Sequence, residues 1–284
     1  QIPYDNISPS KEIQTSRLET LSILSSGNKK KIIVLTTLNA IIQKTLPKNE
    51  ITKNFITISK KSKIKLDELL LLLIKLGYER TSLVRDKSEF AIRGSIIDIF
   101  LPQFEKPIRI DLFDDEIESI FEFDPVTQKR VNKSSIKSFK LNPSSELILD
   151  NKNIEKFRSK FRSIFQNFRK SQTYEMFSSG MIPSGGEQFL PLFYDNLETL
   201  FDYCENSKIL IHNDIIELFD ERSENLNDYF EVRNNSKDSF FLKPHNLFID
   251  KDYFEKILSN FSITKLSLFN NEGDNPINLK KINN

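Results

Sequence analysis

The chain has 284 residues and an almost balanced charge, with 41 Lys and Arg against 40 Asp and Glu. Hydrophobic residues make up 38% and charged residues 29%, a composition typical of globular proteins and too apolar for a disordered chain. The balance argues against a dedicated nucleic-acid binder, because such proteins usually carry a strong basic excess. One cysteine, Cys204, excludes an intramolecular disulfide, and no apolar run approaches the ~20 residues of a membrane-spanning helix. We therefore expect a globular protein of the reducing cytoplasm.

The beginning of the chain has the pattern of an α/β protein. Apolar residues at helical spacing predict a helix over residues 10–25. The continuous apolar run at 31–35 predicts a short strand buried on both faces of a parallel sheet. A second helix is expected over 38–46, where Pro47 closes it. This order of helix, strand and helix is typical of α/β layers. Because the chain begins at Gln1 and not at Met, we also expect it to be part of a longer protein.

The pattern changes to a period of two in the next part of the chain. A strand at 55–58 and a helix at 65–77, ended by Gly77, precede the change. Alternating apolar and polar residues then predict antiparallel strands at 82–84, 89–94, 95–101, 107–113, 117–123 and 136–141. One helix beside such a meander predicts a separate small α+β domain over residues 59–143.

Helical spacing returns after this domain. The remaining predicted elements are a helix from Asn151, a loop at 180–186, a buried strand at 208–212, a helix from Asp214, a strand at 263–269 and a polar linker from Asn270.

The sequence contains no pattern that indicates catalysis. It has neither a Gly-x-x-x-x-Gly-Lys-Ser/Thr loop nor a Gly-x-Gly-x-x-Gly run, so no phosphate-binding loop is predicted. His212 and His245 are far apart and lack metal-ligand spacing, and Cys204 has no nearby activating base. The acidic run at 114–116 could be a metal cluster, but its position between two strands favours a solvated hairpin turn. We expect no catalytic residue, metal or cofactor in this chain.

The strand predicted at 107–113 carries the most informative pattern. Its apolar positions alternate with Arg109, Asp111 and Phe113, so these three should lie together on the face of the sheet turned away from the helix. Arg93, on the preceding hairpin, can share that face. Exposed arginine beside exposed phenylalanine is typical of protein interfaces. The alternative is a surface ion pair between Arg109 and Asp111, with Phe113 covered by a loop.

Three runs of sequence favour the interface. The segments EFAIRGSIIDIFLP at 89–102, PIRIDLFDDEIESI at 107–120 and FDPVTQ at 123–128 closely resemble the UvrB-homology domain shared by transcription-repair coupling factors (Mfd) and UvrB. In that family the domain docks onto UvrA, the damage-sensing ATPase. The matching positions imply that Arg93, Arg109 and Phe113 contact UvrA.

Other segments resemble the coupling factors and not UvrB. UvrB carries a long DNA-clamping insertion after its first loop, whereas here Tyr4–Pro9 leads directly into the helix at 10–25. Residues 157–162 and 181–193 also look like the coupling factors. This resemblance implies a RecA-like domain that has lost ATP hydrolysis, formed by residues 1–58 and 144–270, with 59–143 inserted and 271–284 as a linker.

The resemblance also describes a parent protein. It implies an ATP-dependent DNA translocase that displaces stalled RNA polymerase, with ATP and Mg in motor domains beyond this chain. RNA polymerase and duplex DNA would be bound by those other parts. Two alternatives stay open: a fragment of a UvrB-like damage-verifying ATPase with a phosphate loop upstream of Gln1, and a direct DNA-binding module that uses the lysines at 29–31 and 60–65.

Overall fold

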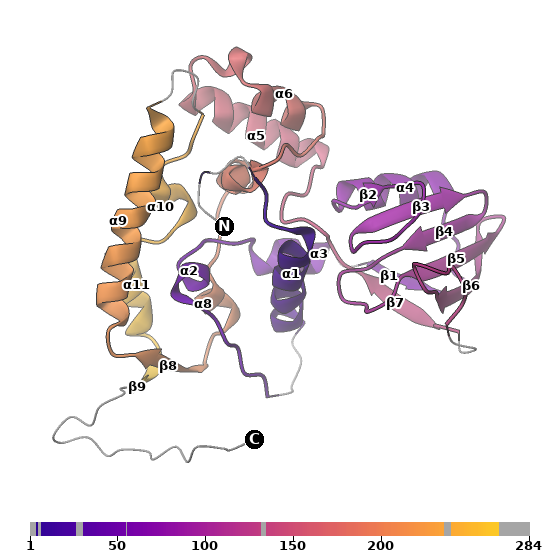
Figure 1. The fold of residues 1–284 in the computed structure, drawn as a ribbon, viewed down its shortest axis with the longest axis horizontal. Coiled ribbons are helices and arrows are strands. Elements are labelled where there is room, and N and C mark those ends of the chain that lie inside the picture. The colour runs from indigo at the N-terminus through magenta and orange to yellow at the C-terminus, as the bar shows by residue number, and fades with distance from the viewer. Residues whose placement is uncertain are drawn as a thin grey trace.

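The computed structural model describes residue 4 and residues 7–26, 31–54, 56–131, 135–235 and 240–266. These residues form a mixed α/β protein, which confirms the predicted class. Figure 1 shows a mainly helical lobe and a second lobe built on a sheet. The chain enters the sheet lobe after α3 (Lys48–Lys53) and returns to the helical lobe at α5 (Asn151–Ile164).

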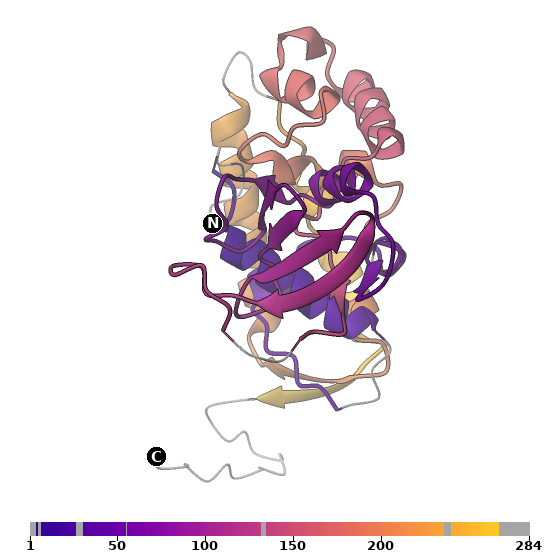
Figure 2. The same ribbon diagram turned by 90° about the vertical axis from the view of Figure 1, so that its right-hand side faces the viewer.

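The sheet lobe contains one five-stranded sheet, one helix and a separate strand pair. In the sheet, β3 to β6 are antiparallel neighbours in sequence order, and β2 lies parallel to β3 at one edge. Figure 2 shows this sheet in front of the helical lobe. The elements are β1 (Ile56–Ser59), α4 (Leu66–Lys75), β2 (Glu79–Arg80), β3 (Glu89–Arg93), β4 (Ile96–Ile99), β5 (Ile108–Phe113), β6 (Glu116–Glu122) and β7 (Ser138–Leu141).

The helical lobe is assembled from segments on both sides of the sheet lobe in sequence. Its remaining elements are α1 (Lys11–Ser25), α2 (Leu38–Ile41), η1 (Phe168–Lys170), α6 (Gln172–Ser178), η2 (Gly186–Phe189), α7 (Leu190–Phe193), α8 (Leu200–Tyr203), β8 (Lys208–His212), α9 (Ile215–Asn234), α10 (Pro244–Leu247), α11 (Lys251–Leu258) and β9 (Ser262–Leu266).

Side-chain caps fix the starts of the two predicted long helices. The Ser10 hydroxyl accepts a hydrogen bond from the Ile13 amide at the start of α1, and the Asp150 carboxylate accepts one from the Asn153 amide at the start of α5. Each cap satisfies a backbone donor that the first turn of a helix leaves unpaired. The helix predicted over 65–77 is α4.

The two lobes have separate hydrophobic cores. In the sheet lobe, Leu69 and Leu73 of α4 belong to one buried cluster with Ile97, Ile110 and Ile120 of the sheet. The helical lobe has a core of phenylalanine rings, as expected of a chain with 24 Phe and no Trp. The ring of Phe157 lies 4.8 Å from that of Phe177 and 4.9 Å from that of Phe193, between centroids.

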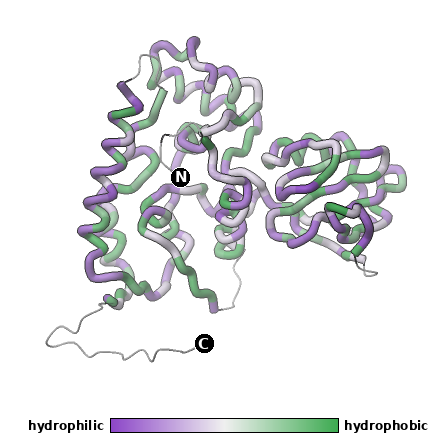
Figure 3. The backbone as a smooth tube through the Cα atoms, viewed as in Figure 1, coloured by the Kyte–Doolittle hydropathy of each residue, from purple (hydrophilic) through white to green (hydrophobic). Residues whose placement is uncertain are grey.

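The strand predicted at 31–35 is wrong. These residues form no strand and pair with none of the described strands, and Ile33 and Leu35 are 90% and 93% exposed. A strand needs a partner for its backbone groups, and an apolar run does not supply one. Figure 3 shows the hydrophobic stretch on the outside of the helical lobe, just before α2. The strand predicted at 208–212 exists and pairs in parallel with β9, but it is not buried, since Leu210 is 63% exposed.

Other predicted elements also differ from the structure. The helix expected over 38–46 is α2, which ends at Ile41 because Gln43 and Thr45 form bridges to Phe248 and Glu198. Residues 82–84 form a loop, and the edge strand β2 precedes them.

The strand expected at 136–141 is β7, which pairs with β1 and does not extend the meander. The strand expected at 263–269 is seen as β9, and its last residues and the predicted linker from Asn270 lie outside the described residues.

Candidate partner-binding face

The five-stranded sheet has one face packed on α4 and an opposite face, called here the open face. On β5, Ile108, Ile110 and Leu112 are buried toward α4, as the alternation predicted. The open face carries Arg93, Ala91, Ile96, Asp98, Arg109, Asp111 and Phe113, because Asp98 pairs with Ala91 and Arg109, and Ile96 pairs with Arg93 and Asp111. Residues paired across antiparallel strands point to the same side of a sheet.

Phe113 lies at the exposed end of the open face. Its side chain is 75% exposed, so the alternative that a loop covers it is wrong. The acidic run beside it forms the turn between β5 and β6, with Asp114 in the left-handed region at φ 57°. This confirms the solvated hairpin turn that the sequence favoured over a metal cluster. A large apolar side chain held at the tip of a hairpin is available to a partner protein.

Arg109 is not displayed in the way the alternation suggested. Its side chain is only 15% exposed, and its Nε and Nη2 donate to Oδ1 and Oδ2 of Asp98 at 2.7 and 2.9 Å. Nη2 also donates to the Gln128 side chain at 3.1 Å, and the guanidinium lies 4.5 Å from the centroid of the Phe123 ring. The hydrogen bonds from Arg109 to Asp98 raise the pKa of Arg109 above its usual value.

The alternative ion pair between Arg109 and Asp111 is therefore wrong as well. Asp111 instead accepts a hydrogen bond from the Ser119 hydroxyl at 2.7 Å. Asp98, which occupies the ion-pair position, was missed by the sequence argument. The available signal was an acidic residue inside the apolar strand 95–101, since a carboxylate there needs a cationic partner.

Arg93 is the more accessible of the two arginines. Its side chain is 45% exposed, and Nη2 donates to Oδ2 of Asp98 at 2.6 Å. Asp98 thus joins Arg93 and Arg109, and two guanidinium groups against one carboxylate leave this cluster with a net positive charge. The structure brings together two of the predicted partner residues, while Phe113 stands apart at the hairpin tip.

Loops cover part of the open face. Val84 from the loop after β2 and Phe123 from the loop after β6 form a small buried cluster with Ala91 and Phe100. The second loop also exposes Val126, whose side chain is 88% exposed. By the strand register, Val126 follows the end of β6 that lies opposite the Phe113 end of the hairpin.

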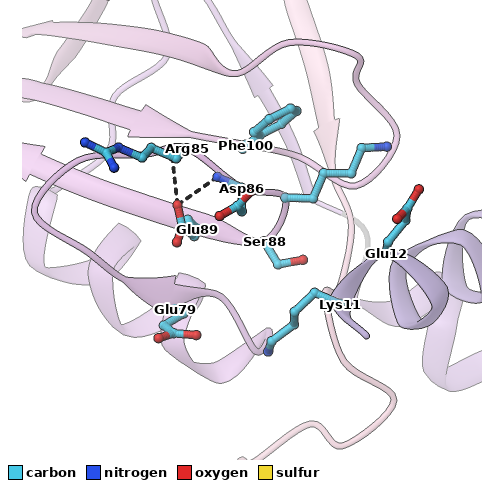
Figure 4. Close-up of a pocket in the computed structure, with 9 residues that line it drawn as sticks. Lys11, Glu12, Glu79, Arg85, Asp86, Ser88, Glu89 and Phe100 are labelled. Carbon is cyan, nitrogen blue, oxygen red and sulfur yellow. Dashed lines mark hydrogen bonds between the residues drawn. The ribbon is translucent and has the colours of Figure 1, made fainter. Parts of the chain in front are cut away.

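A cavity of about 470 Å³ lies between α1 and the sheet lobe (Figure 4). Charges of both signs line it, from Lys11 and Glu12 of α1 to Arg85 and Glu89 of the sheet lobe. The Glu89 carboxylate already accepts hydrogen bonds from the backbone amides of Arg85 and Asp86. Ser88, the hydroxyl of this lining, has a buried Oγ that makes no hydrogen bond with the residues that the structure describes.

The cysteine and the first of the two histidines of the chain lie outside this cavity. Burial raises the pKa of the half-buried Cys204 thiol, which disfavours its nucleophilic form. His212 ends β8, as expected, with Nδ1 3.3 Å from a carboxylate oxygen of Asp214. The part of the chain that the structure describes has no cluster of His, Cys, Asp or Glu able to hold a metal. None of its helices is long and apolar enough to cross a membrane.

The sheet lobe is the part of the chain that matches a known domain family. Residues 56–147 match the family of the UvrB interaction domain, and this range contains the five-stranded sheet and the whole open face.

Longer similarities extend over both lobes. The chain is 33% identical over 263 residues to the transcription-repair-coupling factor of Haemophilus influenzae, with 92% of this chain and 23% of that protein covered. It is 33% identical over 278 residues to the same factor of Rickettsia typhi, covering 95% of this chain and 24% of that protein. For the factor of Escherichia coli the identity is 31% over 268 residues, covering 93% and 23%. Residues 56–147 are therefore similar to the UvrB interaction domain, and most of the chain is similar to transcription-repair-coupling factors, of which it spans less than a quarter in all three cases.

Proposed function

We propose that this chain is a partner-recruiting module of transcription-coupled nucleotide excision repair, which binds UvrA through the open face. The observation that carries the proposal is the 75% exposure of Phe113 on the same face of the sheet that presents Arg93. The match of residues 56–147 to the UvrB interaction domain supports a partner from the same repair system. The names of the relatives support the link to transcription.

The chemistry of the face specifies what the partner should present. Burying Phe113 in an apolar pocket is worth about 1.5–3 kcal/mol from apolar transfer alone. Arg93 donates one hydrogen bond from Nη2 to Asp98, and its side chain is about half exposed. It can therefore also donate to a carboxylate of the partner. Asp111 lies on the same face and would form part of the polar rim. The matching surface of UvrA should therefore be an apolar pocket next to an acidic group.

The wider proposal concerns the rest of the molecule. Residues 1–58 and 144–270 would form a RecA-like domain without ATP hydrolysis and with no catalytic residue of its own, and 59–143 would be the inserted UvrA-binding domain. The parent protein would be a cytoplasmic, ATP-dependent translocase that binds duplex DNA and displaces stalled RNA polymerase, with ATP and Mg in motor domains beyond this chain. The coverage of only 23% of two relatives supports further domains in those proteins.

The test is binding of this chain to UvrA from the same organism, measured by calorimetry. Phe113→Ala and Arg93→Ala should each weaken binding at least tenfold, about 1.4 kcal/mol. Val126→Ala is the matched control for Phe113→Ala, because Val126 is another exposed apolar residue of the same lobe. Arg169→Ala, in the helical lobe, controls for the loss of one exposed arginine. Neither control should change the affinity.

Two outcomes would contradict the proposal. Wild-type affinity in both Phe113→Ala and Arg93→Ala would mean that the contact lies elsewhere on the lobe. No binding of UvrA, together with binding of undamaged duplex that weakens steeply with salt, would favour the direct DNA-binding alternative.

A further inference from the structure

Asp98 is a carboxylate at a position where a β-sheet usually has an apolar residue. It is fully buried in β4, between the isoleucines at 97 and 99. Removing a carboxylate from water is unfavourable unless charged partners and hydrogen bonds replace the water. Both oxygens of Asp98 accept hydrogen bonds from guanidinium groups, which satisfies this condition. A charged Asp98 carboxylate is therefore tolerated inside the sheet because Arg93 and Arg109 bind it.

The two arginines are held to very different degrees. Arg109 makes the two-point contact with Asp98, donates to Gln128 and packs on the Phe123 ring, so its polar groups are directed into the protein. Arg93 makes one contact with Asp98 and is 45% exposed, against 15% for Arg109. Arg93 is therefore the more accessible arginine of this pair at the open face.

We propose that Asp98 is a positioning residue of the UvrA-binding face, and that Arg109 acts through Asp98 without contacting the partner. The inference rests on the proposed function and refines it. Arg109 fixes the Asp98 carboxylate, and the carboxylate fixes the guanidinium of Arg93 in the orientation that the partner meets. A long side chain held in place before binding loses less conformational freedom on binding, which increases affinity without a new contact.

The substitution Asp98→Asn separates two explanations of binding: attraction by the net charge of the face, and orientation of Arg93 by Asp98. Asp98→Asn removes a negative charge, so a face that attracted an acidic partner by charge alone would bind more tightly. If Asp98 positions Arg93, the same substitution weakens binding, because the amide nitrogen of Asn repels the guanidinium donors. Arg109→Lys keeps the charge but loses the planar fork that binds both oxygens of Asp98, and it should weaken binding as well.

The experiment measures the affinity of the whole chain for UvrA with a double-mutant cycle. Asp98→Asn should weaken binding about tenfold, and Arg93→Gln should weaken it at least as much. The double variant should bind no more weakly than Arg93→Gln alone, because Asp98 acts through that arginine. By contrast, Asp98→Asn and Phe113→Ala should give additive losses.

Glu105→Gln provides the charge control. Glu105 is exposed in the loop between β4 and β5, so its substitution changes the net charge equally and should leave affinity unchanged. Wild-type or tighter binding by Asp98→Asn would overturn the proposal. Additive losses for Asp98→Asn and Arg93→Gln would also overturn it, since general loosening of the fold reduces affinity whether or not Arg93 is present.

A second measurement needs neither UvrA nor a folded variant. Phenylglyoxal modifies accessible arginines, and mass spectrometry of the native wild-type chain gives the rate at each position. Arg109 should react at least tenfold more slowly than Arg93. Equal rates would overturn the inference even if UvrA binds. Protection of Arg109 in a chain that does not bind UvrA would instead mean that the arrangement exists but the proposed function is wrong.

Discussion

Asp98 of β4 and Arg109 of β5 lie directly opposite each other, and their side chains form a two-point ion pair with distances of 2.7 and 2.9 Å. Arg109→Ala would leave a buried carboxylate with Arg93 as its remaining cation. We expect it to lower the free energy of unfolding by about 2–4 kcal/mol, because the cost is that of an under-compensated buried charge. Arg93→Ala, which removes a half-exposed partner, should cost about 1 kcal/mol or less. Urea unfolding followed by circular dichroism measures both values.

Equal stabilities for the two variants would contradict this difference. The unfolding free energies also determine how the affinities of these variants for UvrA are interpreted. If Arg109→Ala is destabilised as expected, its loss of affinity for any partner combines a structural effect with a direct one. Arg93→Ala and Phe113→Ala are then the cleaner probes of contact.

The ring of Phe157 is the centre of the helical lobe's core. It is fully buried and contacts the rings of Phe161, Phe177 and Phe193, with centroids 4.8 to 5.2 Å away. Phe157→Ala should therefore lower the free energy of unfolding by about 3–5 kcal/mol. Phe113→Ala is the same substitution at a 75% exposed site and should cost less than about 0.5 kcal/mol. Thermal or urea unfolding of the two variants under one buffer tests the contrast.

The alternation of β5 was predictable because it is local. Side chains of a strand alternate between its two faces, so Ile108 and Ile110 could be assigned to the core from neighbouring residues alone. The same reasoning found the exposed Phe113 and the hairpin turn after it. Helix α1, with Ser10 as its cap, was also evident from local signals.

The failures involve contacts between segments that are distant in sequence. Residues 31–35 have the composition of a buried strand, but pairing depends on a partner that local composition does not reveal. Likewise, Arg109 looked exposed because alternation specifies a face and not what covers it. Asp98 and the loop that carries Gln128 and Phe123 enclose it, 11 to 19 residues away in the chain.

Gly77, which follows α4, is a position where both the backbone angle and the available space disfavour a side chain. Its φ is +87°, and an added Cβ would lie 2.6 Å from the Cβ of Ser145. Gly94 has a similar φ of +63° but open space around it. Gly94→Ala should therefore cost about 1–2 kcal/mol from backbone strain alone, whereas Gly77→Ala should cost a further 1–3 kcal/mol, roughly, from overpacking. Equal losses in urea unfolding would mean that the contact with Ser145 relaxes.

Glu187 links η2 to the start of the chain and should make stability depend on pH. It accepts hydrogen bonds from the Ser8 hydroxyl at 2.9 Å and the Gln14 amide at 3.1 Å, and burial raises the pKa of its carboxyl above the usual glutamate value. The folded state therefore binds the proton more tightly than the unfolded state. The stabilisation of the folded state by this tighter proton binding is therefore complete below the ordinary glutamate pKa. It is lost as the pH rises through the raised pKa of Glu187.

Glu187→Gln removes this titration and keeps an oxygen acceptor for Ser8. The variant should be as stable as the wild type, or more stable, near pH 7, and should lose that advantage as the pH is lowered toward 4. Glu224→Gln, at an exposed position of α9, controls for the loss of one negative charge. Melting temperatures between about pH 4 and pH 8 measure the difference, which should follow the sign given by proton linkage. A wild type that gains stability over Glu187→Gln as the pH rises would mean that the hydrogen bonds from Ser8 and Gln14 outweigh burial at this carboxylate.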